Sequence, residues 1–169
     1  MGVELADLIT PVNVGSFTVG RWTEVPSLAD LPEVHVQLLR GAVTAALATI
    51  NPDGRPQLTP VWCNTDGTSV FLNSKKGRLK DRNLQERPEV TLLLVNPENA
   101  YHWIEIYGRV VEAVDETDPE RGHLATESID ELAETYLGQR PYPLRDPSGE
   151  VRVRYRVEPT KVVTFGPVT

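Results

Sequence analysis

The sequence predicts a mainly β protein with helical additions, most simply a β-barrel carrying two or three helices. Several short apolar runs are separated by Asp-Gly turns, a strong local signal for hairpins. Segments with helical spacing interrupt these runs, which is typical of a barrel with added helices. The length of 169 residues suits one domain, residues 1–169, with an N-terminal arm at 1–25 and a helix-plus-loop insert at 118–149.

The first half of the chain is expected to place one helix before three strands. Residues 1–25 indicate an arm or an irregular strand. A helix is expected to begin near Asp30, which can cap it, and to end at Gly41, with Pro32 tolerated in its first turn. Pro56 and Pro60 flank or interrupt the second of the following runs, which favours an edge, a bulge or a ligand-facing segment. The predicted strands are Ala42–Asn51, Gln57–Asn64 and Ser69–Asn73.

The second half is expected to alternate strands with two helices. A short helix over Gly77–Glu86 would be halted by Arg87-Pro88. The segment Trp103–Val114 alternates apolar and polar residues, as a long strand does, and the spacing over Asp118–Leu137 predicts a helix that ends at Gly138. The remaining predicted strands are Val90–Val95, Val151–Val157 and Val162–Phe165.

Charge and composition exclude several classes of protein. Seventeen Lys and Arg against 24 Asp and Glu give a net charge of −7, which is unfavourable for general nucleic-acid binding. No stretch approaches the ~20 uninterrupted apolar residues that span a bilayer, and the N-terminus does not resemble a secretory signal. The single cysteine, Cys63, has no internal disulfide partner. We therefore expect a cytoplasmic protein without nucleic-acid or membrane partners.

One basic cluster stands against this acidic background. Five of the eight residues 75–82 are basic, and three of the four lysines of the chain lie there. In a helix, Lys76 and Lys80 would share a face, as would Arg78 and Arg82, and each like-charge pair should cost ~0.2–0.5 kcal/mol. A bound anion would make this arrangement favourable, because the helix N-terminus and the cations beside it would all attract the anion. The segment therefore indicates a phosphate site, with a solvated basic turn as the alternative.

The order of these motifs resembles a known family. The string Arg78-Leu79-Lys80-Asp81-Arg82-Asn83-Leu84, preceded by Ser74 and by Gln57-Leu58-Thr59-Pro60-Val61-Trp62, is similar to the split β-barrel proteins that include pyridoxamine 5′-phosphate oxidases. It looks closest to the branch of reductases that use the deazaflavin coenzyme F-420. The long arginine-rich substrate signature of the oxidases is not recognisable here. The resemblance is good over roughly residues 35–115 and looser over the tail.

The resemblance implies a homodimer with a cofactor groove between its subunits. It assigns the contacts with the tricyclic ring to one strand, the phosphate side to the basic cluster, and two aromatic side chains to the neighbourhood of the ring, in the same subunit or across the dimer. The implied cofactor is F-420, with FMN as the alternative. The cofactor-binding residues carried over are Thr59, Pro60, Val61, Trp62, Asn73, Ser74, Lys75, Lys76, Arg78, Lys80, Tyr101 and Trp103.

The implied activity is hydride transfer between the deazaflavin and a small unsaturated or quinone-like substrate. The alternatives are an FMN-binding oxidoreductase on the same barrel and a non-catalytic module that binds flavin or haem. The catalytic residues are not identifiable, since such a cofactor carries the chemistry itself. His35, His102 and His123 show no metal-ligand spacing, so no metal site is expected. Only His102 is placed to ligate haem; it could also donate a proton, but a surface or packing role is the better interpretation.

Two further features of the sequence have a structural as well as a functional interpretation. Cys63 is better interpreted as a small buried residue than as a nucleophile. Arg152, Arg154 and Arg156 would share one strand face. They could add charge to the cofactor site or form a solvated face paired with acids such as Glu105.

Overall fold

The structure is a computed structural model that describes residues 3–7, 10–13, 16–18, 22–25, 27–146 and 149–166; before residue 27 it describes the backbone alone. It contains a 3-10 helix, η1 (Leu28–Asp30), and three α-helices, α1 (Glu33–Arg40), α2 (Leu79–Glu86) and α3 (His123–Leu137). The strands are β1 (Val3–Asp7), β2 (Thr10–Asn13), β3 (Ser16–Thr18), β4 (Trp22–Val25), β5 (Ala45–Ile50), β6 (Pro56–Val61), β7 (Cys63–Thr65), β8 (Val70–Lys75), β9 (Glu89–Asn96), β10 (Asn99–Asp115) and β11 (Arg152–Phe165).

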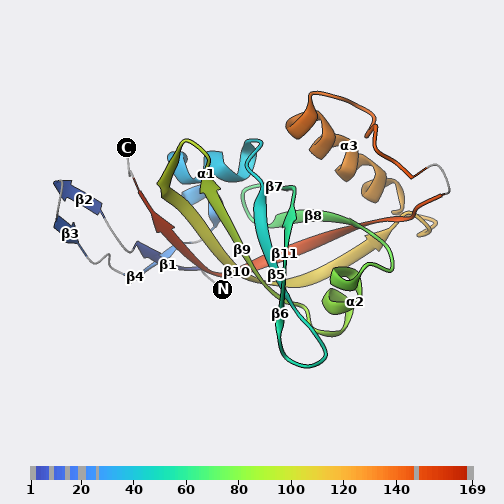
Figure 1. The fold of residues 1–169 in the computed structure, drawn as a ribbon, viewed down its shortest axis with the longest axis horizontal. Coiled ribbons are helices and arrows are strands. Elements are labelled where there is room, and N and C mark those ends of the chain that lie inside the picture. The colour runs from blue at the N-terminus through green and yellow to red at the C-terminus, as the bar shows by residue number, and fades with distance from the viewer. Residues whose placement is uncertain are drawn as a thin grey trace.

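The described strands form a nine-stranded sheet and a separate β2–β3 hairpin. The order in the large sheet is β4-β1-β11-β10-β9-β5-β6, and β8 pairs with both β11 and β7. All of its pairings are antiparallel except that of β1 with β11. Figure 1 shows the long strands β9, β10 and β11 curving across the molecule, and β8 extends the sheet from β11 to β7. The predicted mainly β, split-barrel fold is confirmed.

The barrel is filled by the alternating faces of its strands. Ile104 and Ile106 of β10 are buried, and so are Leu92 and Leu94 of the paired strand β9. The residues next to them, such as Thr91, Glu105 and Tyr107, are half-buried or exposed, as the alternation in the sequence predicts. Helix α1 contributes Val36, Leu38 and Leu39 to the same core. Burial of this apolar surface is the main contribution to the stability of the barrel.

The C-terminal strand differs from the prediction of two separate strands. β11 runs unbroken through Pro159, which has no N–H to donate. Pro159 lies between the part of β11 that pairs with β8 and the part that pairs with β1, and its partner Gly108 stands at a register shift of β10. A Cβ at Gly108 would come within 2.6 Å of a Val157 methyl carbon. The irregular pairing therefore accommodates proline inside a long strand.

Other helix and strand boundaries also differ from the predicted ones. The predicted strand Gln57–Asn64 breaks at Trp62 into β6 and β7. The helix expected to start at Gly77 begins at Leu79 instead, with Arg78 as its N-cap residue. Asp30 caps η1 through Ser27 rather than starting α1. The N-terminal arm adds β1 and β4 to one edge of the sheet, while its side chains lie outside the described residues.

The helices occupy different parts of the barrel surface. In Figure 1, α1 covers one end of the curled sheet, α2 lies below the tip of β8, and α3 lies above β8 and β11. Helix α3 contacts β8, β10 and β11. It belongs to the insert at 118–149, which therefore folds back over the barrel instead of extending from it. No helix among the described residues is long and apolar enough to cross a membrane.

Candidate functional site

The main candidate site is a cavity of about 380 Å³ between the barrel and the insert. Its barrel side comes from the end of β6, from β8, from the start of α2 and from the start of β11, and α3 with the loop after it forms the other side. The described residues that line it are Thr44, Pro60, Val61, Trp62, Asn73, Arg78, Lys80, Ile129, Leu132, Tyr142, Leu144 and Arg152. This set contains three cations, no carboxylate and several apolar side chains.

The three cations lie close enough to influence one another. Burial lowers the pKa of Lys80, and the charges of Arg78 and Arg152 lower it further. Among the described residues, neither the Lys80 ammonium nor the Arg78 guanidinium has a hydrogen-bonding or ion-pair partner. The site thus holds positive charge that the surrounding protein leaves uncompensated, which is the electrostatic condition for binding an anion.

Arg152 is the deepest of these cations. Its side chain is 6% exposed and lies 3.4 Å from the equally buried carboxylate of Glu150. Its Nε donates to Asn73 Oδ1 at 2.8 Å, and the Asn73 amide in turn donates to the Ala125 carbonyl of α3 at 2.9 Å. Burial lowers the pKa of the Arg152 guanidinium. Asn73 therefore connects the floor of the cavity to the insert.

Asp81 holds the turn that presents Arg78. Its carboxylate is 1% exposed and accepts hydrogen bonds from the Gly77 N–H, the Gln85 side chain and the Tyr155 hydroxyl. Gly77 has a φ of 82°, which favours glycine at that position of the turn. Because Asp81 fixes this turn to the barrel strand β11, the start of α2 is anchored where Arg78 and Lys80 line the cavity.

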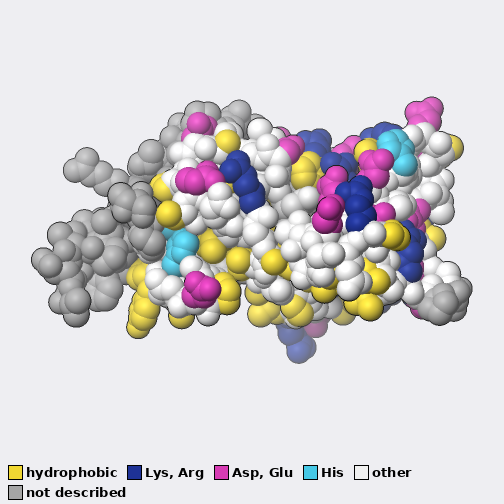
Figure 2. Space-filling model, turned by 90° about the horizontal axis from the view of Figure 1, so that it is seen from above, with side chains coloured by type: hydrophobic (Ala, Val, Ile, Leu, Met, Phe, Trp, Pro, Cys, Tyr) yellow, Lys and Arg dark blue, Asp and Glu magenta, His cyan; other side chains and the backbone are white. Residues whose placement is uncertain are grey.

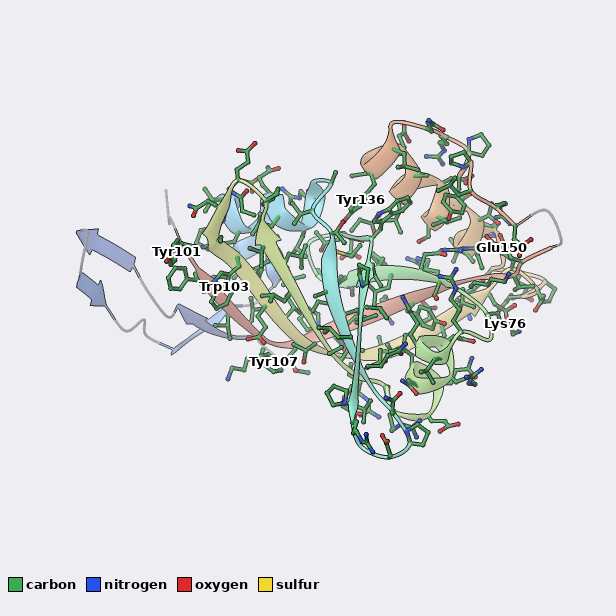
Figure 3. All side chains as sticks on the ribbon, viewed as in Figure 1. Lys76, Tyr101, Trp103, Tyr107, Tyr136 and Glu150 are labelled. Carbon is green, nitrogen blue, oxygen red and sulfur yellow. The ribbon has the colours of Figure 1, made fainter. Side chains whose placement is uncertain are left out.

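The basic cluster divides into side chains with different partners. Lys75 pairs with Asp146 at 2.9 Å, and Lys76 pairs with Asp115. Neither lysine lines the cavity. Lys76 precedes α2, so the helical face predicted for Lys76 and Lys80 does not form. Figure 3 shows Lys76 near Glu150 at the far end of the molecule.

The strand that the resemblance predicts to contact the ring lies beside the cavity. Pro60, Val61 and Trp62 line it, and Thr59 lines a shallower depression of about 260 Å³ that shares Thr44 and Pro60 with it. The Thr59 hydroxyl is buried without a hydrogen-bond partner among the described residues. This strand therefore offers an apolar surface, and its one unpaired hydroxyl is buried.

The insert packs its aromatic side chains against Trp62. The Tyr136 ring stacks on Trp62 with centroids 5.0 Å apart, and Tyr142 meets it edge-on at 6.1 Å. The Tyr136 hydroxyl donates to the Val43 carbonyl at 2.8 Å and accepts from the Cys63 N–H at 3.3 Å. Figure 3 shows Tyr136 between α3 and the barrel. Both tyrosines belong to the predicted insert, but no local pattern in the sequence indicates that they contact Trp62.

The other candidate residues lie elsewhere. Ser74 is buried on β8, outside the lining of the cavity, and its Oγ has no partner among the described residues. Tyr101, which is 72% exposed, and Trp103, which stacks on Phe165, lie at the opposite end of the barrel (Figure 3). Within one chain these two aromatics do not meet the cavity, so their assignment stays a prediction that depends on a second subunit.

His102 and Cys63, the other candidate residues of the sequence, are both buried in the packed interior. His102 is buried, packs edge-on against His35 and shares a 3.0 Å hydrogen bond with Asn96. Among the described residues, no group of His, Cys, Asp or Glu is arranged to hold a metal ion. Cys63 is fully buried, and burial raises the pKa of its thiol to about 12, which confirms the prediction of a buried rather than a nucleophilic cysteine.

The three arginines on the outer face of β11 have different partners. Arg152 enters the cavity, whereas Arg154 and Arg156 both approach Glu112, at 3.8 and 3.5 Å. On the face shown in Figure 2, basic and acidic side chains lie next to one another rather than forming a continuous basic surface. The unpaired cations of the cavity are thus a local feature.

Comparison with known proteins identifies the family. The family description for pyridoxamine 5′-phosphate oxidase matches residues 31–161. A solved F-420 reductase is 30% identical with a TM-score of 0.65, over 78% of this chain and 98% of that chain. The conserved hypothetical protein Rv2991 from Mycobacterium tuberculosis is 26% identical with a TM-score of 0.62, over 77% and 81% of the two chains.

A more distant structure shares the fold alone. A protein of unknown function from Agrobacterium tumefaciens is 22% identical with a TM-score of 0.58, over 80% of this chain and 56% of that one. No functionally curated protein matches the sequence significantly. The family match spans more than half of the chain and agrees with the split barrel observed here. The chain therefore belongs to the pyridoxamine 5′-phosphate oxidase family of split β-barrel proteins, which bind flavin or the deazaflavin F-420.

Proposed function

We propose that this protein is a cytoplasmic oxidoreductase that uses coenzyme F-420 to transfer a hydride to or from a small unsaturated or quinone-like molecule. One observation carries the proposal: Arg78, Lys80 and Arg152 line a cavity that contains no carboxylate. Such an arrangement is unfavourable for the free protein and becomes favourable once an anion is bound. F-420 supplies that anion through its phosphate and its glutamyl carboxylates.

The cavity fits an anionic ligand with an extended apolar part. The cations gather where α2 and β11 begin, whereas Val61, Trp62 and Leu132 supply apolar surface next to them. Charge-assisted hydrogen bonds from Arg78 and Lys80 would hold the phosphate side. The planar ring system would then lie along β6, where the Thr59 hydroxyl is without a partner.

The similarity to a solved F-420 reductase supports the deazaflavin over FMN. The longer tail of F-420 also offers several anionic groups to Arg78 and Lys80, whereas FMN offers a single phosphate. An FMN-dependent oxidoreductase on the same barrel is the alternative that the experiment below separates from this proposal.

The residues of the chain would bind, orient and exclude water. Bound F-420 supplies the hydride chemistry through the C5 carbon of its ring. The cations would fix the tail, and the end of β6 together with Trp62 would orient the ring. Tyr142 and Leu144 of the insert cover the cavity from the other side and so limit the access of water. The described lining residues include no carboxylate or imidazole, and the roles that the structure supports for them are binding and positioning.

We also propose that the protein acts as a homodimer. Tyr101 is largely exposed at the end of the barrel opposite the cavity, where a second subunit could use it. In a pair of chains, Tyr101 and Trp103 of one subunit would approach the cofactor groove of the other. A molecular mass of two chains in solution, with loss of F-420 affinity in Tyr101→Ala, is the expected result. A monomer that binds F-420 with full affinity would contradict this arrangement.

The test of the function is a parallel titration of the ligand-free protein with F-420 and with FMN, followed by absorbance and by calorimetry. We expect saturable binding of F-420 that is at least tenfold tighter than binding of FMN and that weakens with salt. Tighter binding of FMN would contradict the proposal and support an FMN-dependent oxidoreductase instead. Binding of neither cofactor would contradict the proposal.

A further inference from the structure

Helix α3 borders a second cavity on its other flank. This cavity has a volume of about 210 Å³ and lies between α3 and the β7–β8 hairpin, next to β11. It shares none of its lining residues with the cationic cavity. The described residues that line it are Asn64, Thr65, Asp66, Phe71, Leu124, Glu127, Ser128, Glu131 and Arg154.

Two buried polar atoms of this lining have no partner among the described residues. Ser128 is 4% exposed, and its Oγ makes no hydrogen bond. The Oδ1 of Asn64 is also buried and unpartnered. A buried polar atom without a partner destabilises the fold, and serine favours a helix less than alanine does. Folding alone therefore gives no reason for serine at position 128, whereas a ligand that donates hydrogen bonds does.

The charge of the lining residues indicates the chemical class of that ligand. Asp66, Glu127 and Glu131 are exposed carboxylates around the cavity. Arg154 is the one cation among the lining residues, and it is already engaged, with its guanidinium 4.2 Å from the centre of the Phe71 ring and 3.8 Å from Glu112. The lining is thus rich in hydrogen-bond acceptors and carries an excess of negative charge.

We propose that this cavity binds a small organic cation with a primary ammonium group. An ammonium has three donors and no acceptor. Asn64 Oδ1 and Ser128 Oγ would accept two of its hydrogen bonds, and a carboxylate of Glu127 or Glu131 would accept the third. The apolar part of the ligand would lie against Leu124 and the Phe71 ring. No group of acidic residues or histidines described here is arranged to hold a metal ion, which favours an organic cation.

The site is independent of the cofactor, so it can be tested without F-420. The probe is n-butylammonium chloride, titrated into the full-length ¹⁵N-labelled protein and followed by NMR. Sodium butyrate and n-butanol, which carry the same chain without the ammonium, serve as matched ligands. We expect saturable shifts at the backbone amides of residues 64 and 128 with butylammonium alone. Equal shifts with n-butanol, or no saturable shifts with any of the three, would overturn the proposal.

Three variants separate a ligand-binding role from a structural one. We expect Ser128→Ala to weaken butylammonium binding about fivefold or more, which is the loss of roughly one hydrogen bond. The same variant should unfold at an equal or higher denaturant concentration, because it removes an unpaired buried hydroxyl. A structural hydroxyl would instead lose stability and leave binding unchanged, and that result would overturn the proposal.

The carboxylates are tested in the same way. Glu127→Gln combined with Glu131→Gln should weaken binding more than Glu134→Gln, which alters another exposed glutamate of α3 that pairs with Arg140 outside the cavity. Equal binding in both proteins would show that the carboxylates of this cavity do not attract the cation, and would contradict the proposal.

Discussion

Four of the five basic residues at 75–82 form two groups whose surroundings differ although they are neighbours in the sequence, and the fifth, Arg82, donates to the Gly77 carbonyl. Lys75 and Lys76 each pair with an aspartate from a distant part of the chain. Arg78 and Lys80 line the cavity without acidic partners and lie near the third cation, Arg152. Two lysines thus join the basic turn to the rest of the fold, while the next two cations leave positive charge for a ligand. A dense basic segment therefore indicates an anion site only where the acids of the fold leave it unpaired.

The largest expected effect comes from removing the unpaired group. Arg78→Ala combined with Lys80→Ala should weaken F-420 binding at least 100-fold, because two charge-assisted hydrogen bonds are worth roughly 3–6 kcal/mol together. The paired group provides the control: Lys75→Ala combined with Lys76→Ala should change the affinity less than about tenfold. Fluorescence titration measures both affinities. If the two double variants lost affinity equally, the distinction between the groups would be wrong.

A smaller effect is expected from the carboxylate that holds the basic turn. Asp81→Asn replaces a buried acceptor of three hydrogen bonds and should lower the free energy of unfolding by about 1–3 kcal/mol. F-420 affinity should fall with it, because Arg78 is no longer fixed. Urea unfolding and cofactor titration check the two effects. Asp130→Asn, which alters the acceptor of the Tyr142 N–H, is a control that should leave the turn in place. Unchanged stability in Asp81→Asn would contradict the anchoring role.

The attachment of the insert is tested at Tyr136. Tyr136→Phe keeps the stack on Trp62 and removes the hydroxyl that donates to the Val43 carbonyl. Burial raises the pKa of that hydroxyl, so it stays a neutral donor at physiological pH. We expect a loss of about 0.5–1.5 kcal/mol in the free energy of unfolding. Tyr101→Phe alters an exposed ring and should cost nothing measurable. Equal stability in the two variants would mean that this hydroxyl does not hold the insert.

The smallest expected effect is a dependence of stability on pH. Because folding lowers the pKa of Lys80, the unfolded chain binds more protons than the folded chain between the two pKa values. The contribution of Lys80 to the free energy of unfolding should therefore rise with pH across that alkaline range, and its full destabilising effect should be present below the range. Cys63 and Tyr136, whose pKa values are raised by burial, contribute with the opposite sign, so the effect of Lys80 is read as the difference between the parent and Lys80→Met. That difference in the free energy of unfolding should rise with pH, whereas the profile of Lys76→Met should run parallel to that of the parent. Parallel profiles for the parent and Lys80→Met would contradict the buried, unpaired lysine.

Local patterns in the sequence predicted the strands better than the site. The alternation around Ile104 and Ile106 is a property of neighbouring residues, and the structure confirms it. The partners of Lys75 and Lys76 lie 71 and 39 residues away, so no local pattern shows that these cations are paired. The continuous strand through Pro159 likewise depends on where β8 and β1 end.

The cavity itself arises from long-range packing. The stack of Tyr136 on Trp62 joins positions that are 74 residues apart, and it forms only once the insert has folded over the barrel. The family resemblance predicts that Arg78 and Lys80 bind the cofactor, and both residues line the cavity. It did not distinguish Arg152, which enters the cavity, from Arg154 on the same strand, which faces the second cavity.

The most direct measurement is the pKa of the Lys80 ammonium, read by NMR in protein with isotope-labelled lysine. The chain has four lysines, so Lys80→Arg identifies the signal. We expect a pKa below the ordinary lysine range in the free protein, and a higher value once F-420 is bound, because its anionic tail favours the ammonium. A Lys80 that titrates identically with and without bound F-420 would contradict the claim that this cation group binds the cofactor.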